Sequence, residues 1–186
     1  MPLPEPFAAR TLAHTRVLRF ETYRREDGLW DVEGHLTDHS NHDVNLVWGG
    51  IRSRGDALHD MVIRLTVDDT LRIVDALAVS DMHPYPGICS RIEPDYKCLV
   101  GLTLARGFRK NVQELFGGVR GCTHLTEMLG NFPTAMIQAM ASRRQHGDVK
   151  DKPPQLDRCH ALDTRGEIVA QYYPRWAGDK NGKQES

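Results

Sequence analysis

The sequence predicts an α+β fold in which an antiparallel sheet carries helices packed on one face. Residues with the two-residue alternation of strands lie mainly between 17 and 79, whereas apolar residues with helical spacing lie between 95 and 140. Strands and helices that are segregated along the chain are typical of α+β domains. Two flanking hairpins are expected in addition, one before this core and one near the C-terminus.

The N-terminal β-hairpin is predicted over residues 17–38. Residues 17–26 and 29–38 both alternate, and Asp27-Gly28 between them is a strong signal for a tight turn. In the second strand, one face is predicted to carry Trp30, Val32, Gly34 and Leu36.

Two further strands are predicted at 61–67 and 71–79, joined by a short polar turn. The Gly-rich stretch 39–56 before them is predicted to be a loop. The stretch 81–94 contains three prolines and is also predicted to be a loop, which carries Cys89.

Three helices are predicted after these strands. The first two cover 95–105 and 110–116, and the third begins near Thr123 as N-cap, with Pro133 expected to kink it or split it in two. A last hairpin is predicted to flank the turn 163–166, with strands at 159–162 and 168–173.

The composition indicates a globular protein without a dominant charge. Of 186 residues, 24 are basic and 25 acidic, so the net charge of −1 disfavours nucleic acid and anionic membranes as partners. The length predicts a single domain at 15–176, with an extended arm at 1–14 and a disordered tail at 177–186.

Residues 1–16 contain three prolines, three charged residues and no long apolar run, so no signal peptide is expected. We therefore expect a cytoplasmic protein whose four cysteines stay reduced. Cys98 and Cys159 are expected to be core residues. The sequence leaves a homo-oligomer open.

Cys122 and His124 form the strongest local cluster, at the predicted start of the third helix. A thiol at a helix start is favoured as a thiolate, which can bind a metal or attack an electrophile. Two helical residues two apart point roughly 200° apart, so both can serve one site only if Cys122 precedes the first turn. The alternative is that Cys122 begins the apolar face of the helix and His124 is solvated.

His59 and Asp60 form a second cluster, just before a strand. They can supply two metal ligands, or a base with its orienting carboxylate, although a surface ion pair is the commoner outcome. Cys89 is the third element. Its wide spacing from His59 and Cys122 suits a site assembled by the fold, because the sequence has no CxxC motif.

Arg24 and Arg25 lie in the first hairpin and form a candidate anion site, because guanidinium groups pair with carboxylate or phosphate. The alternative is cross-strand ion pairing with Asp31 and Glu33. No P-loop, GxGxxG, HExxH or GxSxG motif is present, so no nucleotide cofactor is expected.

Four segments resemble a bacterial family known only as a conserved domain of unknown function. They are YRREDGLWDVEGHLTD, HDMVIRLTVDD, GGVRGCTHLTEML and CHALDTRGEIVAQYYPRW, and the resemblance covers about 15–176. It implies one fold unit and no established activity.

A more distant resemblance concerns the iron–sulfur scaffold proteins of the NifU/IscU type. His59-Asp60-Met61 with the following IVDALA strand resembles their Cys-Gly-Asp unit, and Cys89 and Gly121-Cys122-Thr123-His124 follow in the scaffold order. The resemblance implies a NifU/IscU-like core and a ligand set of His59 or Asp60, Cys89 and Cys122. Because His59 replaces the first scaffold cysteine, such a mixed set suits zinc or iron better than a [2Fe–2S] cluster.

Three functions follow as hypotheses. The first is a zinc or iron protein, with a lyase or hydrolase activity on a small carboxylate or acyl compound that Arg24 or Arg25 clamps. The second is a metal-free enzyme or sulfur acceptor that uses Cys122 as nucleophile and His124 or His59 as base. The third is an accessory interaction module, in which Trp30, Trp48 and loop 39–56 form the contact surface.

Overall fold

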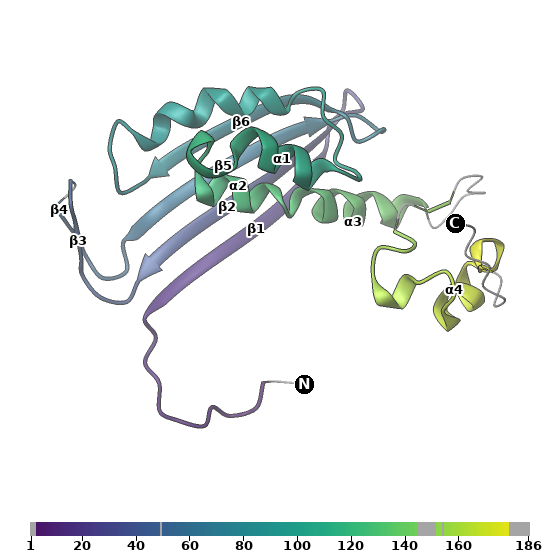
Figure 1. Ribbon diagram of the computed structural model, residues 1–186, viewed down its shortest axis with the longest axis horizontal. Coiled ribbons are helices and arrows are strands. Elements are labelled where there is room, and N and C mark those ends of the chain that lie inside the picture. The colour runs from purple at the N-terminus through teal and green to yellow at the C-terminus, as the bar shows by residue number, and fades with distance from the viewer. Residues whose placement is uncertain (1–2, 49, 145–151, 154, 179–186) are drawn as a thin grey trace. The chain divides into compact units, whose positions relative to one another are not determined.

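The computed structural model describes residues 3–48, 50–144, 152–153 and 155–178 (Figure 1). The chain divides into two compact units, Met1–Met136 and Ile137–Ser186. The expectation of one domain over 15–176 stays a prediction.

A four-stranded antiparallel sheet forms the frame of the first unit. Its strands are β1 (His14–Arg24), β2 (Trp30–Ser40), β5 (Ala57–Val67) and β6 (Ile73–Met82), in the order β1-β2-β5-β6. Every neighbouring pair is antiparallel. The α+β class is therefore confirmed, and so are the N-terminal hairpin and the two later strands.

The predicted loop 39–56 is wrong in part, because it contains a second, small hairpin. β3 (Val44–Leu46) and β4 (Gly50–Arg52) pair antiparallel. Three apolar side chains of this hairpin are strongly exposed: Val47, Trp48 and Ile51.

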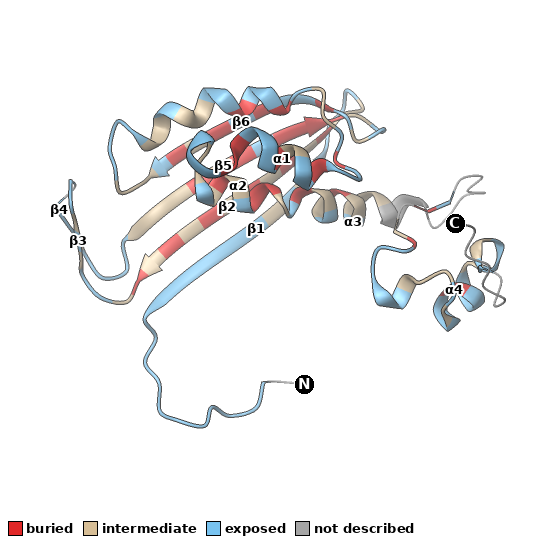
Figure 2. Cartoon of the chain, in the orientation of Figure 1, coloured by how far each residue is buried: buried red, intermediate tan, exposed pale blue. Residues whose placement is uncertain are grey.

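One face of the large sheet is buried. Along β2 every second residue from Trp30 to Ser40 is buried, because successive side chains of a strand point to opposite faces. In Figure 2 buried positions run along β2, β5 and β6, whereas β1 at the sheet edge is exposed over most of its length. The sheet contributes these buried apolar residues to the core: Trp30, Val32, Leu36, Met61, Ile63, Leu65, Val67, Ile73, Ala76 and Ala78.

Helices cover that face (Figure 1). They are the 3₁₀ helices η1 (Cys89–Leu99) and η2 (Gly118–Arg120), and the α-helices α1 (Phe108–Phe116), α2 (Thr123–Leu129) and α3 (Phe132–Arg144). Only the first residues of α3, up to Met136, belong to this unit. The helical segment predicted at 95–105 ends at Leu99, and Thr103 instead forms an isolated bridge with Arg72. The predicted break near Pro133 is confirmed, since α2 and α3 are separate.

The C-terminal hairpin predicted in the second unit is wrong. The turn itself exists, because the amide of Gly166 donates to the carbonyl of Asp163 over 2.8 Å. Its flanks are helical, however: η3 (His160–Leu162), α4 (Glu167–Tyr172) and η4 (Pro174–Trp176). Glu167 favours a helix start because it places an acid in the first turn of α4.

No described helix is long and apolar enough to cross a membrane. Residues 3–13 form neither helix nor strand and are exposed. The tail predicted to be disordered lies outside the described residues from 179 onward.

Candidate metal centre

A buried carboxylate, Asp38, lies near the end of β2 on the helix-covered face of the sheet. It continues the buried stripe of that strand and is only 1% exposed. In the sheet register it pairs with Arg16 of β1 on one side and with His59 of β5 on the other. Three polar side chains thus replace apolar ones across three neighbouring strands.

Arg16 holds Asp38 with two hydrogen bonds. Nε donates to Oδ1 over 2.7 Å, and Nη2 donates to Oδ2 over 2.9 Å. The third nitrogen, Nη1, donates to Oε2 of Glu127 in α2 over 3.1 Å. This fork is the strong bidentate geometry of arginine and carboxylate, and it fixes the orientation of the Asp38 oxygens.

Two imidazoles approach the same oxygen of Asp38. Nδ1 of His59 lies 3.1 Å from Oδ2, and Nε2 of His124 lies 3.7 Å from it. The ring centroids of His59 and His124 are 3.9 Å apart, with a tilt of 35° between the ring planes. Despite the short distance, Nδ1 of His59 is buried and finds no well-directed hydrogen bond among the described residues.

The charge states of the three groups suit metal binding. Burial and the neighbouring His124 lower the pKa of His59 to about 4. Burial, followed by the charge of Arg16, also lowers the pKa of His124. Burial alone raises the pKa of Asp38, but hydrogen bonds and charge from Arg16 outweigh it and place this pKa below its usual value. At neutral pH the site holds two neutral imidazoles and one carboxylate, the forms that bind metal.

The spacing of these groups fits a single ion. One ligand atom each from Asp38, His59 and His124 lies within 4.8 Å of the other two. Metal–ligand bonds of about 2.1 Å in a tetrahedron place ligand atoms about 3.4 Å apart. The two distances to Oδ2, 3.1 and 3.7 Å, lie on either side of that value.

Cys122 lies beside this set but outside it. It is the N-cap residue of α2, one residue before the predicted cap, so it precedes the first turn. Its Sγ lies 3.8 Å from Nδ1 of His124, and its backbone amide donates to the hydroxyl of Tyr96 over 3.2 Å. The geometric condition for Cys122 and His124 to serve one site is therefore met.

Asp60 does not join His59. The two are consecutive residues of β5, so their side chains lie on opposite faces of the sheet. On the uncovered face, Oδ1 of Asp60 lies 2.5 Å from Nε2 of His35. Cys89, at the start of η1, is in no cluster of metal-ligating groups that the described residues form.

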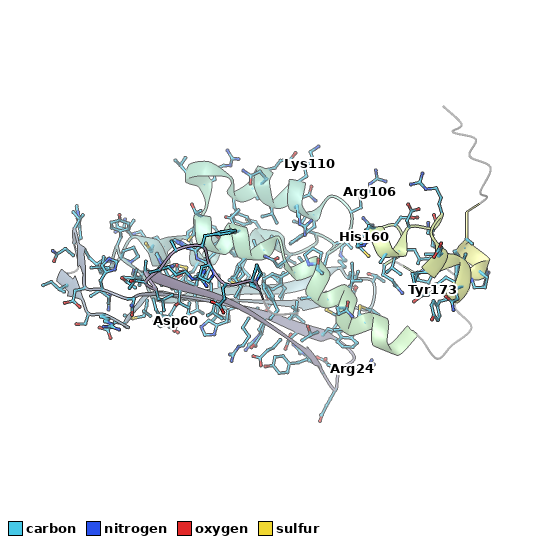
Figure 3. All side chains as sticks on the ribbon, turned by 90° about the horizontal axis from the view of Figure 1, so that it is seen from below. Arg24, Asp60, Arg106, Lys110, His160 and Tyr173 are labelled. Atoms are coloured by element: carbon cyan, nitrogen blue, oxygen red, sulfur yellow. The ribbon has the colours of Figure 1, made fainter. Side chains whose placement is uncertain are left out.

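Arg24 of the first hairpin lies at the other end of the sheet from Asp60 (Figure 3), and Arg25 is the next residue in the chain. Arg25 pairs with Asp27 and Asp31, and Arg24 lies over the ring of Trp30. Arg25 thus forms the cross-strand pair with Asp31 that the sequence left open as an alternative. Trp30 is buried, whereas Trp48 is 78% exposed, so of these two tryptophans only Trp48 lies on an open surface.

Asp38 and Arg16 were missed as site residues, although the sequence carries a signal for them. Asp38 lies two residues beyond Leu36, on the predicted apolar face of its strand, and Arg16 lies two residues before Leu18. A charged residue that continues an apolar stripe is an unusual feature, because buried charge requires a partner.

No curated protein and no solved structure matches the chain. The resemblance to NifU/IscU-type scaffolds therefore stays a prediction. The family model described as "Protein of unknown function (DUF2889)" matches residues 14–138, more than half of the 186 residues, and the chain therefore belongs to this family.

Proposed function

We propose that the chain binds a zinc or iron ion through Asp38, His59 and His124. The supporting observation is the convergence of the three side chains, whose ligand atoms lie within 4.8 Å of one another. Nδ1 of His59 adds to this, because it is buried 3.1 Å from Oδ2 of Asp38 without a well-directed hydrogen bond, and a metal ion between the two atoms would satisfy both.

Two imidazoles and one carboxylate form the ligand set of several zinc enzymes and of non-haem iron(II) sites. Three protein ligands leave a coordination position open, which is the arrangement of catalytic rather than structural sites. A bound divalent cation adds positive charge beside Arg16. We therefore keep a small carboxylate or acyl compound as the proposed substrate class, with a lyase or hydrolase reaction.

Metal titration of chelator-treated protein tests this proposal. Zn²⁺ and Fe²⁺ are added anaerobically to the wild type and to His59→Ala and Asp38→Asn, and binding is measured by calorimetry. Loss of a ligand should weaken binding by more than about 100-fold, because loss of an outer-shell partner alone costs 10–100-fold.

Matched controls are available on the uncovered face of the same strands. His35→Ala and Asp60→Asn remove a histidine and an aspartate of β2 and β5 that contact each other and not the site. Both should bind metal like the wild type. Absence of stoichiometric binding in the wild type, or equal loss in the controls, contradicts the proposal.

The contact between Cys122 and His124 favours a second candidate function, thiol chemistry without a metal. Sγ of Cys122 lies near Nδ1 of His124, while Nε2 of the same ring faces Asp38, an order of nucleophile, base and orienting carboxylate. The substrate would again be an acyl compound or a sulfur donor.

Alkylation at mildly acidic pH, followed by peptide mapping, tests this second candidate. Cys98 and Cys159 are exposed, whereas Cys122 is half-buried, so accessibility alone predicts that Cys122 reacts last. Faster labelling of Cys122, slowed in His124→Gln, supports an activated thiol. Slower labelling of Cys122 rejects it.

A further inference from the structure

We propose that Cys122 is a positioning residue of the metal site: its sulfur accepts a hydrogen bond from Nδ1–H of His124 and thereby turns the Nε2 lone pair toward the metal. This inference rests on the proposed function. Cys122, which the sequence predicts as a metal ligand, would instead contact the ligand His124 and not the metal.

The two ring nitrogens of His124 have different neighbours. Nε2 faces Oδ2 of Asp38 at 3.7 Å, and Nδ1 faces Sγ of Cys122 at 3.8 Å. A neutral imidazole carries one proton. If Nε2 held it, the N–H would face Asp38 at 3.7 Å, and that nitrogen could not bind a cation. With the proton on Nδ1, the sulfur of Cys122 accepts a hydrogen bond from Nδ1–H, and Nε2 is free to coordinate.

The backbone of Cys122, from which the sulfur projects, is held by two hydrogen bonds. The amide of Cys122 donates to the hydroxyl of Tyr96, and its carbonyl accepts the first helical hydrogen bond of α2 from Thr126 over 2.9 Å. Tyr96 is completely buried and stacks on Phe116 with ring centroids 4.4 Å apart. These contacts hold the backbone of Cys122 independently of the ligands, and Sγ reaches Nδ1 of His124 from that backbone.

The sulfur lies outside the converging ligand set. Only Asp38, His59 and His124 meet the mutual distance of 4.8 Å among the residues that the structure describes. Metal-bound histidines generally donate their second N–H to an acceptor that fixes the tautomer and the ring orientation. Cys122 occupies the place of that acceptor.

The experiment compares Cys122→Ala and Cys122→Ser with the wild type, and uses Cys98→Ala as a matched control at an exposed cysteine. Zn²⁺ affinity is measured by chelator competition. We expect Cys122→Ala to bind 10–100-fold more weakly, as for other outer-shell losses, and Cys122→Ser to recover most of this because a hydroxyl also accepts. Cys98→Ala should bind like the wild type.

Two spectra separate positioning from ligation and from a folding effect. The cobalt(II) form of the wild type should lack a thiolate-to-cobalt charge-transfer band; such a band would make Cys122 a ligand and overturn the inference. Long-range ¹H–¹⁵N spectra of the metal-free protein should show the Nδ1–H tautomer of His124, and a shift toward Nε2–H in Cys122→Ala.

The outcomes keep the two proposals distinguishable. A wild type that binds no zinc overturns the proposed function, and this inference with it. A wild type that binds zinc, together with a Cys122→Ala variant of unchanged affinity and tautomer, overturns this inference alone.

Discussion

Asp38 and His59 occupy paired positions on neighbouring strands, with Oδ2 of the carboxylate 3.1 Å from Nδ1 of the imidazole. Asp38 is at the same time paired in register with Arg16 of β1. The sheet alone therefore aligns a guanidinium, a carboxylate and an imidazole in one row, and α2 adds His124 above them. Because the backbone pairing fixes this row, the site depends on strand register more than on loop conformation.

Arg16→Met should destabilise the metal-free protein by about 2–3 kcal/mol at pH 7. The variant leaves a buried carboxylate without its hydrogen-bond fork, and an unpaired buried charge costs more than a lost surface pair. The loss should shrink on acidification, because without Arg16 burial raises the pKa of Asp38 and the variant takes up a proton there at a higher pH than the wild type. Urea unfolding in the presence of chelator measures it.

Arg19→Met is the control for that experiment. Arg19 lies on the same strand, is exposed and pairs with the exposed Glu21 at 3.4 Å. Its removal should change the unfolding free energy by less than about 0.5 kcal/mol. Equal losses in the two variants would show that the Arg16–Asp38 fork is not a stabilising contact.

Stability of the metal-free protein should fall on acidification from pH 7 to 4.5. The folded-state pKa of His59 is about 4 and its ordinary value is 6.5, so between these values the unfolded chain binds more protons than the folded one. Folding stability therefore rises with pH in that window, and its loss at pH 4.5 should be about 2 kcal/mol.

Chemical denaturation of the wild type and His59→Gln at both pH values checks this prediction. Glutamine does not titrate, so the variant should lose less stability on acidification than the wild type. The lowered pKa of Asp38 adds a loss in both proteins, but at lower pH. Parallel losses in wild type and variant between pH 7 and 4.5 would contradict the assignment to His59.

Tyr96→Phe should destabilise the protein by about 1 kcal/mol. The substitution keeps the ring that stacks on Phe116 but removes the hydroxyl that accepts a hydrogen bond from the Cys122 amide. Thermal unfolding measures the loss, and Tyr85→Phe, at a half-exposed residue, is the control. A variant as stable as the wild type would show that the hydrogen bond to the Cys122 amide does not stabilise the protein.

The strands could be predicted from the sequence because their alternation and the Asp27-Gly28 turn are local signals. The site required more than local signals. The alternation of each strand can be continued by two residues, from Leu36 to Asp38 and from Met61 back to His59. This places Asp38 and His59 on the covered face of the sheet and Asp60 on the other face. What the sequence does not contain is the strand order, which brings Arg16, Asp38 and His59 into one row although they are far apart in the chain.

The prediction of a C-terminal hairpin was wrong for a different reason. The segment around Asp163 and Gly166 has a true turn, and a turn between apolar segments fits two strands or two short helices equally well. The length of the flanking segments did not distinguish strands from helices, because each segment has six residues or fewer. Short apolar segments remain ambiguous between helix and strand when periodicity is the only guide.

Gly34→Ala should destabilise the first unit by about 1–3 kcal/mol, although Gly34 lies in a regular strand where alanine is tolerated by the backbone. A Cβ at this position would lie 2.8 Å from ring atoms of both Phe20 and Phe132. These rings pack edge to face with centroids 5.3 Å apart, and Phe132 is fully buried, so it cannot move aside without loss of packing. Urea unfolding measures the effect. The double variant Gly34→Ala, Phe20→Leu should cost less than the sum of the two single variants, because the smaller side chain frees space for the methyl group. Strict additivity of the two substitutions would show that the rings do not confine residue 34.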